Sequence, residues 1–191
     1  FEPLVKHFNR YLTIGGFPEL ALSDDDLYAQ RMLREDVVDK VIKRDVLTLF
    51  KVRSPLLMEK LFLYLCMNST EIFSATTAAK ELDNISPNTI ESYVDALVKS
   101  NLIYMAYPIA VGSKSVLKGR PKIYIADAAI RNAVLMVDDV LSDERELGLL
   151  IETTVYKHLV SFYQGTGAQL GYYRKAKENQ KEVDAVIELP Q

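Results

Sequence analysis

Two carboxylates in the last quarter of the sequence stand where a charge is costly. Glu152 shares a helical face with apolar residues, and Asp184 lies among strand-forming residues in the run 182–189. An ionised carboxylate on an apolar stripe is unfavourable unless it is paired or holds a metal ion. A helix acid and a strand acid supply the oxygen ligands with which Mg²⁺ activates water in phosphodiester hydrolysis. Glu152 and Asp184 are therefore candidate catalytic residues and Mg²⁺ ligands. Alternatively, the strand is a solvated edge, and Arg174 or Lys181 neutralises the carboxylate.

The elements that would position these acids are one helix and two strands. Apolar residues recur at helical spacing across 147–162, which predicts a long amphipathic helix carrying the first acid. The runs 170–174 and 182–189 are typical of strands joined by a polar turn. Because side chains alternate along a strand, Asp184 and Glu182 are expected on the same side of the second strand.

The middle of the chain has the element order of a winged helix-turn-helix. Helical and strand patterns follow one another at 55–65, 74–82, 86–98, 102–107 and 122–126. Ser86 and Pro87 suit the cap and first position of the third helix, and a turn precedes them. Three helices with a tight turn before the third, followed by a hairpin, are typical of this motif.

The hairpin loop is a candidate nucleic-acid contact. Four basic residues cluster within nine positions of this loop: Lys114, Lys118, Arg120 and Lys122. They would give weak, salt-sensitive and sequence-independent contact with a phosphate backbone. The third helix argues against groove reading, because its exposed positions include Glu91 and Asp95, which phosphates repel. A solubilising loop and a protein-packing module are the alternatives.

The N-terminal part of the chain is predicted to be helical. Apolar residues fall at helical spacing as far as Leu12, before a Gly-Gly-Phe-Pro-Glu break in which Pro18 is expected to end regular structure. Ser23 or Asp24 is expected to cap a long helix after this break. Together with the later elements, this predicts a mainly α fold with some β.

The composition excludes several function classes. The chain has 191 residues, 49% of them hydrophobic and 26% charged, which is ordinary for a soluble globular protein. A net charge of -3 gives no overall attraction to nucleic acid, so any such contact must be local. No apolar run approaches the roughly 20 residues that span a membrane. A single cysteine, Cys66, excludes an internal disulfide and fits a cytoplasmic protein.

Several of these segments, taken in order, resemble a known family. The motifs are Gly-Gly-Phe-Pro-Glu at 15–19, Lys-Ile-Tyr-Ile-Ala-Asp at 122–127, Leu-Gly-Leu-Leu-Ile-Glu at 147–152 and Glu-Val-Asp at 182–184. They are similar to the C-terminal half of prokaryotic AAA-type ATPases, in which a P-loop ATPase precedes a helical segment, a winged helix and a PD-(D/E)xK nuclease-like domain. The resemblance implies three regions: a lid-like helical segment at 1–54, a winged helix at 55–135 and a partial nuclease-like α/β domain at 136–191.

The same resemblance assigns roles and shows what this sequence lacks. It implies that Glu152 is the helix acid and Asp184 the strand acid of the nuclease-like core, and that the parent chain uses ATP and Mg²⁺. The sequence contains no Walker loop and no Glu-x-Lys after Asp184, and it begins with Phe1 rather than Met. A fragment of a longer protein is therefore expected, itself without cofactor or catalysis. Its expected role is nucleic-acid or protein interaction, under control of an ATPase partner. The alternative is a metal-dependent nuclease completed by a further strand.

Overall fold

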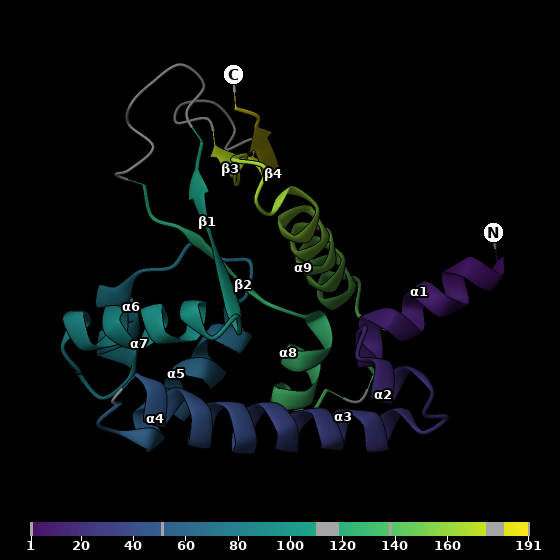
Figure 1. Cartoon of the computed structure of the whole chain (residues 1–191), viewed down its shortest axis with the longest axis horizontal. Helices are drawn as coiled ribbons and strands as arrows, with labels where there is room; N and C mark the ends of the chain where they lie inside the picture. Colours follow the sequence, from purple (N-terminus) through teal and green to yellow (C-terminus); the bar gives the residue numbers. More distant parts are fainter. Residues whose placement is uncertain (1, 51, 110–118, 138, 175–181, 191) are drawn as a thin grey trace.

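Helices dominate the computed structural model, which describes residues 2–50, 52–109, 119–137, 139–174 and 182–190. In chain order the helical elements are α1 (Glu2–Ile14), α2 (Pro18–Ala21), α3 (Asp26–Arg34), η1 (Glu35–Val46), α4 (Leu47–Leu49), α5 (Pro55–Met67), α6 (Ala75–Glu81), α7 (Pro87–Lys99), α8 (Ala128–Leu135) and α9 (Glu144–Tyr163). The strands are β1 (Ile103–Pro108), β2 (Lys122–Ile125), β3 (Gln169–Arg174) and β4 (Glu182–Glu188). This mixed α/β fold, mostly helical, agrees with the predicted class (Figure 1).

Short polar side chains start the helices of the middle segment. Ser54 accepts a hydrogen bond from the N–H of Leu57 and precedes the proline that opens α5. Ser74 caps α6 in the same way. Ser86 occupies the N-cap of α7 and Pro87 its first position, as predicted, although the Ser86 side chain makes no capping hydrogen bond. These caps satisfy main-chain donors that have no partner inside the helix.

The four strands form one sheet in the order β2-β1-β3-β4. β1 and β2 are antiparallel, with Ile103 opposite Ile125 and Ala106 opposite Lys122, so the predicted hairpin pairing is confirmed. β3 and β4 are also antiparallel. β1 and β3 run parallel and pair only at Tyr107 and Pro108 of β1. This short parallel contact joins the middle of the chain to its C-terminal elements.

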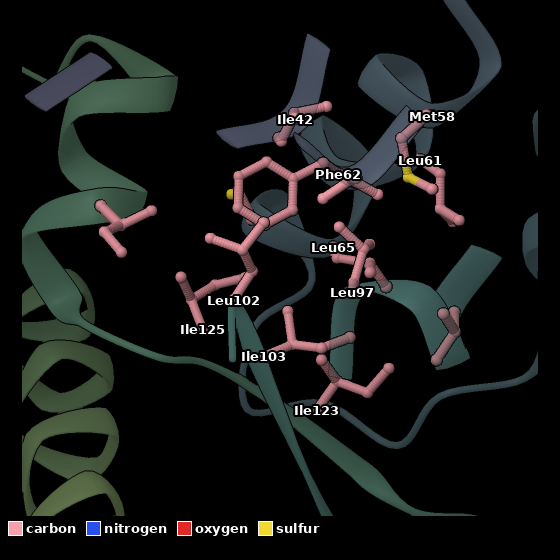
Figure 2. Packing of buried hydrophobic residues seen from close by; sticks show 14 of the residues in the cluster. Ile42, Met58, Leu61, Phe62, Leu65, Leu97, Leu102, Ile103, Ile123 and Ile125 are labelled. Atoms are coloured by element: carbon pink, nitrogen blue, oxygen red, sulfur yellow. The ribbon is translucent and has the colours of Figure 1, made fainter. Parts of the chain in front are cut away.

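The main hydrophobic core lies between the helices and one face of the β1–β2 hairpin. Figure 2 shows buried side chains from η1, α5, α7 and both strands pointing toward one another. Phe62 and Leu65 of α5, Leu97 of α7 and Ile103 of β1 are almost fully buried there. The opposite face of the hairpin carries Tyr124, which packs in a separate cluster against α9. The hairpin is therefore covered on both faces.

The N-terminal segment differs from its prediction in two details. Pro18 does not end regular structure but begins α2, because proline suits the first turn of a helix. The cap of the long helix is Asp25 rather than Ser23 or Asp24, and the Asp25 carboxylate accepts from the N–H of Tyr28. That helix then continues without a break through η1, a wider π-helical stretch, to Leu49.

α8 and α9 connect the N-terminal helices to the sheet. Asp127 caps α8, and its carboxylate also binds Lys157 of α9, whose ammonium donates to the Tyr11 hydroxyl of α1. Arg131 of α8 forms a two-bond ion pair with Glu146 of α9. Among the described residues, no helix is both long and apolar enough to cross a membrane.

Candidate functional site

A buried lysine gathers three carboxylates at the junction of the hairpin with the C-terminal elements. The Nζ atom of Lys122, in β2, lies 2.8 Å from Asp184 Oδ1 and 3.4 Å from Glu152 Oε1. It also forms an ion pair with Glu182. The two acids singled out in the sequence therefore converge on one cation. With Glu182 they come from α9 and β4, elements that follow Lys122 by 30 residues or more.

The site opens to solvent through a cleft of about 350 Å³. Its lining residues come from the α5–α6 connection, β2, α9, β3 and β4: Thr70, Glu71, Ile72, Lys122, Glu152, Arg174 and Glu182. The Lys122 side chain is only 6% exposed, whereas that of Asp184 is 53% exposed. The cation therefore lies inside the wall and the strand acid lies at the rim.

A bulge in β4 helps to place the strand acids. Gly171 pairs with Val186 but Tyr173 pairs with Val183, so Asp184 and Ala185 both lie opposite Tyr172. A bulge of this kind re-aims side chains and increases the local twist of the strand. Glu182 and Asp184 nevertheless both reach Lys122, as strand alternation predicts.

Two stacked tyrosines form the apolar side of the site. Tyr124 is fully buried, and its hydroxyl donates a hydrogen bond of 2.7 Å to Glu152 Oε1. The Tyr124 ring stacks on Tyr156 of α9, with ring centroids 4.1 Å apart and planes within 7°. Lys122 and Tyr124, two positions apart in β2, thus present an ammonium and a hydroxyl to the same carboxylate.

Burial and charge both act on the acid–base properties of the cluster. Burial by itself lowers the pKa of Lys122, but the hydrogen bonds to Asp184 and Glu182 outweigh it and hold the pKa above its usual value. Burial raises the pKa of Glu152, although the Tyr124 hydroxyl and the ammonium of Lys122 oppose this. Burial and the neighbouring Glu152 raise the pKa of Tyr124. Lys122 is therefore charged in this site.

In the described arrangement a lysine lies among the three carboxylates. In the described part of the chain, no group of three or more His, Cys, Asp or Glu residues has the geometry to hold a metal ion. Glu152, Glu182 and Asp184 instead surround the ammonium of Lys122, which occupies the space between their oxygens. The three carboxylates thus bind the ammonium group of Lys122, a cation supplied by the protein itself.

The structure describes two of the four candidate nucleic-acid residues, and these two differ in their exposure to solvent. Arg120 is exposed, but Lys122 is buried and its charge is directed at carboxylates rather than at solvent. The prediction that Lys122 shares an exposed basic surface with Arg120 is therefore wrong. Lys114 and Lys118 lie outside the described residues. On α7, Glu91 and Asp95 are exposed as expected, and Asp95 pairs with Lys99.

Sequence reasoning missed the two β2 residues of the site. The sequence predicts Lys122 both as part of the basic cluster and as the start of the strand at 122–126, and Tyr124 only as part of that strand. The available indication was alternation: in Lys-Ile-Tyr-Ile, the two polar side chains occupy one face and the two isoleucines the other. A lysine and a tyrosine on a strand face require polar partners if that face is covered. Arg174, the alternative partner for the acids, lies 3.7 Å from Glu182.

Comparison with known proteins gives relatives that are longer than this chain. MJ1637, an uncharacterized protein of Methanocaldococcus jannaschii, is 30% identical over 175 residues, which cover 90% of this chain and 36% of that protein. MJ1544 of the same organism is 25% identical over 82% of the chain and 34% of its own length. Rv2008c, an uncharacterized protein of Mycobacterium tuberculosis, is 28% identical over 92% and 39%.

The chain therefore spans between 34% and 39% of the length of these relatives. No solved structure gave a significant match. A family model described as "Domain of unknown function (DUF8612)" matches residues 5–141. Because this match covers most of α1, all elements from α2 to α8 and more than half of the 191 residues, the chain belongs to the DUF8612 family.

Proposed function

We propose that this chain is an interaction region of a longer protein, and that it binds a protein partner under the control of an ATP-binding portion. The resemblance to the C-terminal half of AAA-type ATPases supplies the ATP-binding partner. The observation that carries the interaction role is the exposed apolar face of α1. In the family that the chain resembles, the ATPase precedes the helical segment to which α1 belongs.

The apolar face of α1 is formed by Leu4, Val5 and Phe8, whose exposed fractions are 67%, 54% and 40%. They fall within about a quarter of the helix circumference, and α1 extends away from the remaining elements (Figure 1). Contiguous exposed apolar residues on a soluble protein mark interaction sites. The end of α1 nearer the body is anchored by Leu12, which is fully buried.

The charge of the middle segment favours a protein partner over DNA. The order α5, α6, α7, β1, β2 is that of a winged helix, and in DNA-binding versions the third helix enters the major groove. Here that helix is α7, whose exposed side carries Glu91 and Asp95. Their charge repels phosphates. We infer that this winged-helix-like segment packs against protein.

The test uses the ATPase portion of the parent protein, expressed separately, and measures its association with this chain by titration calorimetry. The double substitution Leu4→Asp and Phe8→Asp should weaken association by at least about tenfold, since it removes two apolar anchors. Lys6→Asp, on the other side of α1, is the matched control. Undiminished binding by the double variant would remove α1 from the interface. A mobility shift of duplex DNA at low salt by the unmodified chain would favour the nucleic-acid version instead.

A second candidate function is the metal-dependent nuclease, completed by a further strand that carries Glu-x-Lys. The convergence of Glu152 and Asp184 within 3.4 Å of one atom favours it. In that version Lys122 must leave the carboxylates before they can hold Mg²⁺. A longer chain that includes the next strand would then cleave DNA with Mg²⁺, and Asp184→Ala would abolish cleavage. Equal activity in both chains would remove Asp184 from the site.

A further inference from the structure

The main-chain groups of β1 alternate between the two neighbours of this strand. The N–H of Ala126 donates to the C=O of Leu102, which fixes the hydrogen-bonded pairs of the β1–β2 ladder at every second residue from there. Tyr104 therefore directs its N–H and C=O toward β2. Ile103 and Met105 direct theirs toward the opposite edge, the side on which β3 lies.

β3 covers only the far end of this edge. It pairs with Tyr107 and Pro108, and the N–H of Ile109 donates to the C=O of Tyr172. Within the described ranges, no main-chain partner is found for the N–H of Ile103 or of Met105. Among the described residues, this half of the β1 edge therefore has no ladder partner, the feature on which an added strand forms. Ile103 is 1% exposed and Met105 is partly exposed, so an added strand would reach this edge at Met105.

This edge borders a groove between α7 and α9. The groove has a volume of about 1290 Å³, and Ile103, Tyr104 and Met105 are among its lining residues. A volume of this size exceeds the roughly 300–1,000 Å³ of pockets for small molecules. The groove thus has room for a length of chain, placed where an unpaired ladder begins.

The two walls of the groove differ in chemistry. The α7 wall contributes Val94 and Val98 together with the carboxylates of Glu91 and Asp95. The α9 wall contributes Tyr156, Val160, Ser161 and Tyr163, and Arg120 also lines the groove. α7 packs on the face of β1 that carries Ile103, and Tyr156 contacts Tyr104 on the other face. A strand added to β1 would therefore direct alternate side chains to α7 and to α9.

We propose that this groove binds an extended peptide segment as an additional strand on the Ile103–Met105 edge. Side chains directed toward α7 would be Lys or Arg, whose aliphatic stems cover the valines and whose charges meet Glu91, since Asp95 is already paired with Lys99. Side chains directed toward α9 would be apolar. The peptide thus alternates basic and apolar residues. This proposal deepens the proposed interaction function by naming the class of partner that a second surface, distinct from α1, accepts.

The experiment follows amide hydrogen exchange in the whole ¹⁵N-labelled chain. The probe is an acetylated, amidated peptide of sequence LKLKLK. Its binding should slow exchange at Met105, the partly exposed residue of this edge, by at least about tenfold, because that N–H group gains an acceptor. Tyr104 is the internal control, since its N–H already faces β2. A peptide with alternate main-chain nitrogens methylated cannot form the ladder and should give no protection.

A second experiment tests the charge of the α7 wall. Glu91→Lys should weaken LKLKLK binding by about fivefold and strengthen binding of LELELE, because a rim ion pair is reversed. Glu81→Lys, exposed on α6 away from the groove, should change neither. Equal binding of the methylated peptide, protection confined to other residues, or protection by a thymidine dodecamer in place of the peptide would overturn the proposal. The Leu4→Asp, Phe8→Asp variant should bind LKLKLK normally, so a failure of the α1 interface and a failure of the groove are distinguishable.

Discussion

At the residue scale, Lys122 is the cation at the centre of three carboxylates. Its ammonium contacts Asp184, Glu152 and Glu182. The Lys122 side chain is 6% exposed, so its charge acts on these carboxylates rather than on solvent. Removing one partner from such a cluster leaves the others uncompensated, which costs more than the intact pairs contribute. The three acids also repel one another once the cation is gone.

Lys122→Met tests this cluster. The substitution keeps most of the aliphatic stem but removes the charge, so we expect the free energy of unfolding to fall by about 3 kcal/mol. Urea unfolding followed by far-ultraviolet circular dichroism measures this loss. Lys99→Met is the matched control: its exposed pair with Asp95 on α7 should cost less than about 0.5 kcal/mol.

A rescue separates charge from packing in the same experiment. If the uncompensated carboxylates cause the loss, adding Glu152→Gln and Glu182→Gln to Lys122→Met should restore about half of the stability, since the remaining partner is solvated. A triple variant that is no more stable than Lys122→Met would assign the cost to the lysine stem and its packing against the cleft wall.

The acids of this site were predictable from sequence, but their partner was not. Glu152 and Asp184 were identified because a carboxylate among apolar residues needs compensation. Their predicted alternative partners were Arg174 and Lys181, which are close in sequence. Strand alternation indicates that Lys122 needs polar partners but not which ones, since the pairing depends on how β2 is placed against α9 and β4, at separations of 30 and 62 residues.

At the scale of elements, Asp127 connects three helices. Its carboxylate accepts from the N–H of Ala129 at 2.9 Å, which caps α8, and it binds the ammonium of Lys157 in α9. Lys157 in turn donates to Tyr11 of α1. Asp127 is 4% exposed, so both roles are carried out away from water. The position at which the chain leaves β2 is therefore also the one that fixes α1 and α9.

Two substitutions at Asp127 distinguish its roles. Asp127→Asn keeps an oxygen for the cap but removes the charge that pairs with Lys157, whereas Asp127→Ala removes both. We expect Asp127→Ala to be less stable than Asp127→Asn by about 1 kcal/mol, the usual contribution of an N-cap. Guanidinium unfolding of the two variants measures the difference. Equal stabilities would mean that the ion pair alone accounts for the contribution of Asp127.

The helices were more predictable than the contacts between strands. Ser74 and Ser86 favour the N-cap position, and Pro87 favours the first position of a helix. The helices α6 and α7 begin where these residues predict. The β1–β2 pairing also followed from sequence, because a hairpin joins neighbours. The parallel contact between Tyr107 and Gly171 joins residues 64 positions apart, with α8 and α9 between them. No periodicity in either strand specifies such a partner.

At the scale of the whole molecule, that parallel contact and the Lys122 cluster hold the C-terminal elements against the rest. β3 reaches β1 at a glycine: a Cβ atom on Gly171 would overlap the main-chain oxygen of Tyr107 and lie 2.9 Å from Ile109 Cγ1. Because backbone rather than a flexible side chain meets the added atom, the two strands must separate to accept it. The same separation would move β4, and with it Asp184, away from Lys122.

Gly171→Ala should therefore destabilise the protein, by about 2 kcal/mol if the cost is that of ordinary overpacking. Gly148→Ala is the matched control on α9, where an added Cβ meets nothing within 4 Å. There alanine is the better helix former and should stabilise by about 0.5–1 kcal/mol. Thermal unfolding measures the melting temperature of both variants, which should fall for Gly171→Ala and rise for Gly148→Ala. If the two variants shift the melting temperature in opposite directions, the added methyl group destabilises the protein only where β3 meets β1. The contact between these two strands then contributes to the stability of the protein. A Gly171→Ala variant as stable as the unmodified chain would show instead that β3 and β1 need not touch, and that the Lys122 ion pairs alone hold β4 in place.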